Sequence, residues 1–263
     1  MCPSPLRIEA PAPGVALLTL DLPERRNAMT AELTAAWTQA IAALAADPGV
    51  RCVVVTGAGK AFCAGGDLGW IGESPDLTVD AIRDRMLPFY RAWLAIRTLE
   101  IPSIAAINGP AVGAGLCLAL ACDLRYAAAG AKLSAPFTQL GMHAGMAATW
   151  LLPEAVGLPV AKELLLTGRA VEGDEAVRIG LVNGVCPAEE LIDTALGAAS
   201  RIAAAAPVAT KLTVAGLRAG AHRGLEDALA YEALAQPVTF ATADLSEGLA
   251  AAKERRTPNF TGR

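Results

Sequence analysis

Two glycine-rich segments carry the most visible chemistry in this sequence, and they would perform it with backbone groups rather than side chains. The first, GAGKAFCAGGDLGW, covers residues 57–70, and the second, GPAVGAG, covers residues 109–115. A glycine turn that opens a helix leaves unpaired N–H groups at the positive end of the helix dipole. Two such turns side by side could aim two N–H groups at one oxygen atom, which is an oxyanion hole.

The small residues that this arrangement needs are present in both segments. The suitable positions are Ala64, Gly65, Gly66, Ala114 and Gly115. The segments are not phosphate-binding fingerprints, because 57–62 lacks the Walker A spacing and 113–119 lacks the GxGxxG pattern. For either segment taken alone, tight packing of a strand on a helix is an equally good interpretation.

Few side chains offer acid–base or nucleophilic chemistry. His143 lies between two glycines in GMHAGM, and an imidazole can give or take a proton near neutral pH. The alternative for His143 is a loop histidine that bonds to backbone. Cys117 lies near the start of a helix, where a thiolate is stabilised, although a small buried core residue is the more common role. We expect His222, in RAGAHRGLE, to lie on the surface.

The acidic residues near the two segments favour structural interpretations. Asp67 directly follows the first glycine cluster and can cap the helix that begins there. Asp123 lies between a helix and a strand, where a carboxylate commonly bonds to local backbone. Glu73 and Asp76 are expected to be solvated loop acids.

The elements that position these residues alternate along the chain. Apolar runs typical of strands cover residues 6–10, 15–20, 51–57, 101–107, 123–129 and 180–186. Helical patterns cover residues 30–46, 77–99, 159–166 and most of the chain after residue 188, and residues 131–157 hold a strand, a loop and a helix. Buried strands that alternate with helices predict an α/β core with parallel strands.

Composition narrows the class of protein. The 263 residues are 54% hydrophobic, enough to fill a sizeable core, and the formal net charge is −4. Without a basic stripe interleaved with aromatics, we expect no nucleic-acid partner. The six cysteines form no CxxC pair and no cluster with either histidine, so we expect buried thiols, a reducing compartment and no metal. The N-terminal residues lack a signal-peptide pattern and the longest apolar stretch is too short to span a bilayer, so we expect a cytoplasmic protein.

Four motifs give the chain a specific resemblance. They are AFCAGGDL (61–68), INGPAVGAGLCLALACDLRYAA (107–128), EAVRIGLVNGV (175–185) and ATADLSEGLAAAKERRTPNFTG (241–262). In order and spacing they resemble the enoyl-CoA hydratase/isomerase, or crotonase, family, and the resemblance runs from about residue 6 to residue 262. It implies an α/β fold, a ClpP-like spiral of ββα units in residues 1–200, followed by a helical trimerisation region in residues 201–263.

The resemblance also implies a substrate and a mechanism. Proteins of this family bind acyl-CoA thioesters, with coenzyme A as part of the substrate and no further cofactor, and they form trimers or hexamers. They hold the enolate-like oxygen with two backbone N–H groups, which map by motif to Ala64 and Ala114. The substrate-binding positions implied in this chain are Arg25, Arg26, Ala28, Lys60, Ala61, Gly65, Gly66, Asp67, Leu68, Trp70, Phe89, Gly113, Gly145 and Lys211.

The sequence departs from the family pattern at the two acids of a hydratase. The expected glutamates are replaced by Cys117, three residues after the second donor, and by Phe137 in the expected P-E pair. Hydration needs a base for water and an acid for the α-carbon, so these replacements argue against it. The remaining alternatives are decarboxylation or double-bond isomerisation with His143 as the acid–base group, or a non-catalytic CoA-binding partner.

A stripe of bulky residues has two interpretations. Its members are Trp70, Met86, Phe89, Tyr90 and Trp93, at near-helical spacing. Core packing is the favoured interpretation. The family resemblance offers the alternative that these residues line the acyl pocket.

Overall fold

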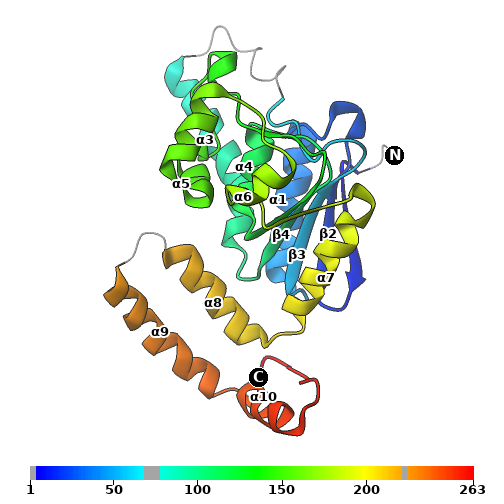
Figure 1. Cartoon of the computed structure of the whole chain (residues 1–263), viewed down its shortest axis with the longest axis vertical. Helices are drawn as coiled ribbons and strands as arrows, with labels where there is room; N and C mark the ends of the chain where they lie inside the picture. The colour runs from blue at the N-terminus through cyan, green and yellow to red at the C-terminus, as the bar shows by residue number, and fades with distance from the viewer. Residues whose placement is uncertain (1–3, 68–77, 221–223) are drawn as a thin grey trace.

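The computed structural model describes residues 4–67, 78–220 and 224–263 (Figure 1). Five residues that the sequence singles out lie outside the described ranges, namely Leu68, Trp70, Glu73, Asp76 and His222.

A six-stranded sheet forms the centre of the molecule. Its strands are β1 (Leu6–Ala12), β2 (Val15–Leu20), β3 (Cys52–Gly57), β4 (Ser103–Ile107), β6 (Leu124–Ala128) and β8 (Gly184–Cys186), in the order β1-β2-β3-β4-β6-β8. Only β1 and β2 are antiparallel, and every later neighbour pairs in parallel. β3 is buried along its whole length, as expected for a strand that is covered on both faces. The α/β fold predicted from the sequence is confirmed.

A second, shorter layer of pairing runs beside the sheet. The strands β5 (Ala111–Val112) and β7 (Leu133–Ser134) pair in parallel. Single bridges extend this layer from Met29 to Gly66, from Cys63 to Ala111 and from Leu133 to Val171. Each turn of the chain therefore contributes a strand to the large sheet and a short extended piece to this layer, which is a spiral of ββα turns.

Helices cover the two layers. They are α1 (Ala31–Ala46), α3 (Val79–Leu94), α4 (Ala114–Ala121), α5 (Ala148–Thr167), α6 (Gly173–Arg178) and α7 (Leu191–Ala203). The short 3₁₀ turns are η1 (Pro23–Arg25), η2 (Ala95–Thr98), η3 (Thr138–Leu140) and η4 (Ala188–Glu190). Thr30 caps α1, because its hydroxyl accepts the Leu33 N–H at 3.2 Å. Trp37 of α1 stacks on Trp93 of α3 with ring centroids 5.1 Å apart, and the helix predicted over residues 30–46 is confirmed.

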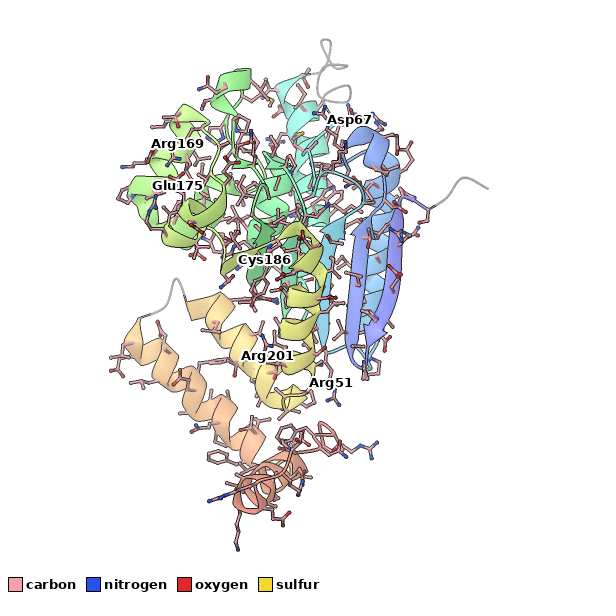
Figure 2. The ribbon with its side chains drawn as sticks, turned by 45° about the vertical axis from the view of Figure 1, so that its right-hand side comes forward. Arg51, Asp67, Arg169, Glu175, Cys186 and Arg201 are labelled. Carbon is pink, nitrogen blue, oxygen red and sulfur yellow. The ribbon has the colours of Figure 1, made fainter. Side chains whose placement is uncertain are left out.

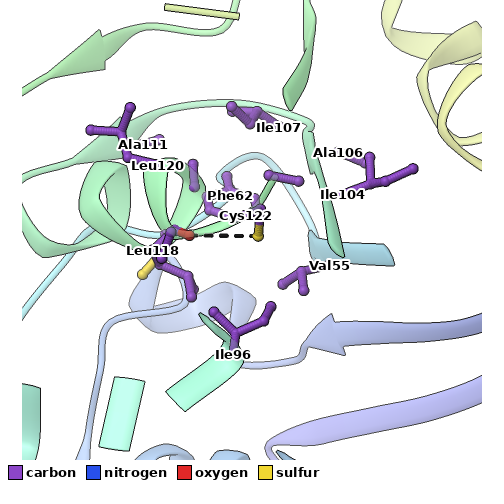
Figure 3. Packing of buried hydrophobic residues seen from close by; sticks show 14 of the residues in the cluster. Val55, Phe62, Ile96, Ile104, Ala106, Ile107, Ala111, Leu118, Leu120 and Cys122 are labelled. Atoms are coloured by element: carbon purple, nitrogen blue, oxygen red, sulfur yellow. Dashed lines mark hydrogen bonds between the residues drawn. The ribbon is translucent and has the colours of Figure 1, made fainter. Parts of the chain in front are cut away.

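The hydrophobic core lies between α4 and the sheet (Figure 3). All eight residues of α4 are buried, which explains the absence of polar residues just inside this helix. Figure 3 shows Leu118 and Leu120 of α4 in one cluster with Val55 and Ile104, and the Cys122 thiol donates to the Leu118 carbonyl at 3.6 Å. The second glycine segment therefore opens a helix that is locked in the core.

Three helices at the C-terminus form an arm outside the core. These are α8 (Pro207–Gly220), α9 (Leu225–Phe240) and α10 (Ala243–Glu254), and Figure 1 shows them extending away from the sheet. The arm begins after α7, which still packs against the sheet. A division at residue 200 into two domains remains a prediction.

The structure modifies two predicted boundaries for local reasons. The strand expected over 180–186 is reduced to β8, because the Leu181 and Val182 N–H groups both donate to the Ala176 carbonyl at the end of α6. The helix expected over 159–166 is the second half of α5, which bends where Gly157 adopts a φ of 73°.

No single helix among the described residues is long and apolar enough to cross a membrane. The helices α7 and α8 meet these criteria only when taken together, and they are bent by 111° relative to each other.

One ion pair fastens the arm to the core. Arg218 of α8 donates to both carboxylate oxygens of Asp123, at 2.8 and 2.6 Å, and to the carbonyls of Arg97, Leu99 and Ile101. The same carboxylate accepts the Ser103 N–H at 2.7 Å at the start of β4. The structural role expected for Asp123 is confirmed, and the Arg218 side chain is only 14% exposed.

Replacement of Arg218 by methionine should loosen this attachment. The change leaves the Asp123 carboxylate and three carbonyls without their cation, and removal of one partner of a largely buried pair costs about 3 kcal/mol. Urea unfolding at fixed protein concentration should show this loss, with the arm helices affected first. Arg83→Met is the matched control, because the Arg83 pairs with Asp80 and Asp84 are exposed and should change stability by less than about 0.5 kcal/mol. Equal effects of the two substitutions would contradict the role given to Arg218.

Candidate active site

The two glycine segments meet at the end of the sheet where β3 and β4 finish. A β-carbon built at Gly115 would lie 2.1 Å from the Cys63 carbonyl oxygen, and one at Gly65 would lie 2.6 Å from the Val112 carbonyl oxygen. The same position at Gly65 is 3.3 Å from the Ala114 nitrogen, and Gly65 has a φ of +93°. Glycine is required at both positions, and its absent β-carbon leaves open the space in front of the Ala114 amide.

A buried asparagine holds the first segment in place. The Asn27 side chain is fully buried, and its amide nitrogen donates to the Ala58, Ala61 and Phe62 carbonyls at 2.8–3.2 Å. Its oxygen accepts the Leu22 N–H at 2.9 Å. Because these bonds satisfy the Asn27 amide inside the core, the segment is anchored by specific contacts and not by packing alone.

The hydrogen bonds of the two segments change one of the expected donors. The Ala64 N–H donates to the Arg26 carbonyl at 3.0 Å, which removes Ala64 from the expected pair. The Gly65, Gly66 and Ala114 N–H groups have no backbone acceptor among the described residues, and Ala114 lies at the N-terminus of α4. The Ala64 N–H is therefore not free, whereas the Gly66 and Ala114 N–H groups are, and the role of the Ala114 N–H as an oxyanion donor stays a prediction. The sequence carries no signal for this shift, because Ala64, Gly65 and Gly66 are all small.

A cavity of roughly 100 Å³ lies against these amides. Its lining residues are Ala64, Gly65, Gly66, Met86, Phe89, Tyr90, Val112, Gly113, Ala114, Pro136, Phe137, Leu140, Met142, His143, Gly145 and Met146. Met86, Phe89 and Tyr90 thus line the cavity, against the favoured expectation of core packing, whereas Trp93 is buried in the core as expected. The described lining contains no carboxylate.

The positions of the two missing glutamates are apolar or neutral. Cys117 is 1% exposed, and its sulfur lies 3.7 Å from the Gly145 carbonyl oxygen. Burial raises the pKa of the Cys117 thiol to about 12, so the thiol stays protonated near neutral pH and is no nucleophile. The Phe137 ring lies on the cavity wall beside Gly113. The interpretation of Cys117 as a small buried residue agrees with this geometry.

His143 lines the cavity from the loop before α5. Its side chain is exposed, and its Nδ1 lies 2.8 Å from the Ala144 carbonyl oxygen. A carbonyl oxygen only accepts, so Nδ1 carries the proton in this contact and Nε2 is left as the exchangeable nitrogen. The imidazole is therefore bonded to backbone and still available to the cavity.

The positions expected to bind the nucleotide end are only partly brought together. Arg25 donates to the Asp67 carboxylate at 2.8 Å and forms an ion pair with it. The helix that Asp67 was expected to cap would begin outside the described residues. Arg26 and Lys60 are exposed nearby, on the segments before and within the first glycine-rich stretch. Ala28 is half-buried and Ala61 is buried, and both belong to the same loops.

Lys211 lies elsewhere. It is on α8, 3.4 Å from Glu100, and it lines a separate cavity with Arg51. Figure 2 shows Arg51 and Asp67 at opposite ends of the core. Within one chain, Lys211 therefore does not reach the cavity beside the glycine loops. Among the residues that the structure describes, no group of three His, Cys, Asp or Glu side chains is placed to hold a metal ion.

Known proteins resemble the chain over its whole length. A family model described as Enoyl-CoA hydratase/isomerase matches residues 11–263. A Thermus thermophilus protein named as an enoyl-CoA hydratase is 41% identical over 246 residues, covering 94% of this chain and 97% of that protein. The crystal structure of enoyl-CoA hydratase from Bacillus anthracis has a TM-score of 0.93 at 34% identity and covers 98% of this chain and 100% of its own. The crystal structure of a protein from Mycobacterium abscessus, described as a probable enoyl-CoA hydratase/isomerase, has a TM-score of 0.90 at 38% identity. It covers 99% of this chain and 100% of its own.

Proposed function

The chain belongs to the enoyl-CoA hydratase/isomerase family, and from that premise we propose that it converts an acyl-CoA thioester through an enolate held by the Gly66 and Ala114 amides. The observation that carries the proposal is that these two N–H groups have no acceptor among the described residues and lie beside one apolar cavity. In such a dry site each donor contributes roughly 2.7–4 kcal/mol to the stability of the transition state. The thioester oxygen is the atom that these amides would hold.

Ordinary hydration is disfavoured by the same cavity. Addition of water across the double bond needs one group that activates water and one that protonates the α-carbon. The described lining offers no carboxylate, and Cys117 and Phe137 occupy the two positions where the family has its acids. We therefore place the activity among reactions that need fewer acid–base groups.

Two reactions meet that condition. In decarboxylation of a malonyl-type thioester, the electrons of the breaking carbon–carboxylate bond form the enolate, CO₂ leaves, and one proton then goes to the α-carbon. In isomerisation of a β,γ-unsaturated thioester, one base removes the α-proton and returns a proton at the γ-carbon. His143 is the exposed acid–base group that exchanges this proton with solvent.

Binding of the rest of the substrate follows from the surroundings of the cavity. We assign the phosphates of coenzyme A to the exposed cations Arg25, Arg26 and Lys60 at the first glycine segment. The five described cysteines are free thiols, which supports the predicted reducing, cytoplasmic location. No further cofactor is needed for either reaction.

Substrate conversion tests the proposal directly. Mass spectrometry of incubations with crotonyl-CoA should show no addition of water, and one malonyl-type or β,γ-unsaturated thioester should be converted. Removal of a positioned acid–base group costs about 10²–10⁴-fold, so His143→Ala should lower that rate by at least tenfold. The control is His222→Ala, at the chain's other histidine, which should leave the rate unchanged. Clear hydration of crotonyl-CoA would overturn the proposed reaction class, and tight binding without any conversion would favour a non-catalytic CoA-binding partner.

The Gly65 position tests the amide pair separately from the acid–base group. An alanine β-carbon there would lie against the Val112 carbonyl and in front of the Ala114 nitrogen, so Gly65→Ala should lower kcat by at least about 10²-fold. Gly157→Ala is the matched control: its φ is also positive, at 73°, but its nearest neighbour is 4.0 Å away. If both variants lost the same stability and the same activity, backbone strain alone would explain the loss.

The C-terminal arm supports a trimer or a pair of trimers. Leu225 is 73% exposed, Leu234 is 75% exposed and Leu249 is 65% exposed, on α9 and α10. Exposed apolar side chains on these two successive helices are the kind of surface that a second copy of the chain would cover. Sedimentation equilibrium at micromolar concentration should give the mass of three or six chains. A monomer mass would contradict the predicted assembly.

A further inference from the structure

Two protic side chains line the cavity, and the structure places them differently. Among the described lining residues only Tyr90 and His143 carry an ionisable O–H or N–H group. His143 is exposed, whereas Tyr90 of α3 is half-buried. If a proton must be delivered inside the apolar cavity, Tyr90 is the group that already lies inside it.

The Tyr90 hydroxyl is fixed against the loop that faces α4. A β-carbon at Gly145 would lie 2.6 Å from the Tyr90 oxygen, so the absence of a side chain at Gly145 leaves room for this hydroxyl. The Cys117 sulfur lies 3.7 Å from the Gly145 carbonyl oxygen, so Tyr90 and Cys117 meet at one residue. Tyr90 therefore brings an O–H group beside the helix position where the expected glutamate is missing.

The surroundings of the hydroxyl favour a donor. A neutral phenol carries one O–H proton that it can donate, and the Tyr90 oxygen lies on the cavity side of Gly145. Burial raises the pKa of Tyr90 above its ordinary value, and the neighbouring Cys117 acts in the same direction, while the Met146 N–H partly opposes them. The phenol is thus neutral at physiological pH and can act as an acid.

We propose that Tyr90 is a catalytic residue of this site, and that its hydroxyl delivers a proton to the α-carbon of the enolate held by the Gly66 and Ala114 amides. The inference rests on the proposed function. The enolate carbon–carbon double bond supplies the electron pair of the new C–H bond, and the thioester carbonyl re-forms. The electrons of the broken O–H bond remain on Tyr90 as a phenolate. Water, through the exposed His143, returns the proton to Tyr90.

The reverse of this step gives an assay that does not depend on which acyl group is natural. A Tyr90 phenolate must remove the α-proton of a saturated thioester such as butyryl-CoA, so the enzyme should exchange that proton for deuterium in D₂O. Because the pKa of Tyr90 lies above its ordinary value, the enzymatic rate should rise about tenfold per pH unit from pH 7 to pH 9. An imidazole base would instead level off near neutral pH.

Tyr90→Phe is the decisive variant, because it removes one oxygen and keeps the ring on the cavity wall. The exchange rate, measured by mass spectrometry and corrected for exchange without enzyme, should fall at least about 10²-fold, and its dependence on pH should vanish. Butyryl-CoA affinity, measured by calorimetry, should change by less than about threefold, since the loss is confined to the transition state. Tyr126→Phe, on β6 outside the cavity, should keep the rate and its pH profile.

Each result decides between the two levels of the proposal. If the wild-type protein exchanges the α-proton and Tyr90→Phe retains both the rate and its slope with pH, Tyr90 is not the donor, while the enolate function stands. If the wild-type protein binds butyryl-CoA but neither exchanges its proton nor converts any thioester, both proposals are overturned. Should Tyr90→Phe fold poorly, fluorotyrosine placed at position 90 alone provides the test. It lowers the phenol pKa, and the rise of exchange with pH must then level off at a lower pH than in the wild-type protein.

Discussion

Close backbone contact between the two glycine segments is the constraint on which the site depends. At Gly115 the neighbouring chain comes so near that a β-carbon would meet the Cys63 carbonyl, and the second layer of pairing passes through the same contact from Cys63 to Ala111. This contact places the end of β3 beside the start of α4. It follows that the cavity, the free amides and the course of the spiral are consequences of one steric condition.

The buried character of α4 gives that contact its rigidity. A helix with every residue inside the core has no face that can turn toward solvent, so its first turn cannot shift without disturbing the packing shown in Figure 3. The same apolar surroundings raise the pKa of Cys117 and leave few protic groups in the cavity. A low local polarity strengthens the interaction of each amide with a developing negative charge. The burial of α4 thus accounts both for the fixed position of the Ala114 amide and for the nearly apolar cavity beside it.

Much of this arrangement could be predicted from the sequence, and the limits have physical causes. The valine-rich run of β3, the capped pattern of α1 and the glycine turns identify the layers, because periodicity and backbone permissiveness are local properties. That the Gly66 N–H and not the Ala64 N–H is free could not be predicted. It depends on the Arg26 carbonyl, which a turn distant in the sequence brings to the Ala64 amide. Tyr90 was hidden for a related reason. Tyr90 belongs to a stripe of bulky residues, and the sequence does not tell which of them reach the cavity. Only the structure shows that the Tyr90 hydroxyl occupies the space that a side chain at position 145 would fill.

The short bridges between turns have a consequence for how the chain folds. Each turn pairs with the next one, as Val53 does with Ser103 in the sheet and Cys63 does with Ala111 beside it. During synthesis the first glycine segment leaves the ribosome well before the residues that cover it, and parallel pairs across such separations form slowly. Until then the β3 edge is a template for any other extended chain. The nascent protein therefore passes through an interval in which the edge of β3 is open to pairing with other chains. Pairing of β4 with β3 ends that interval.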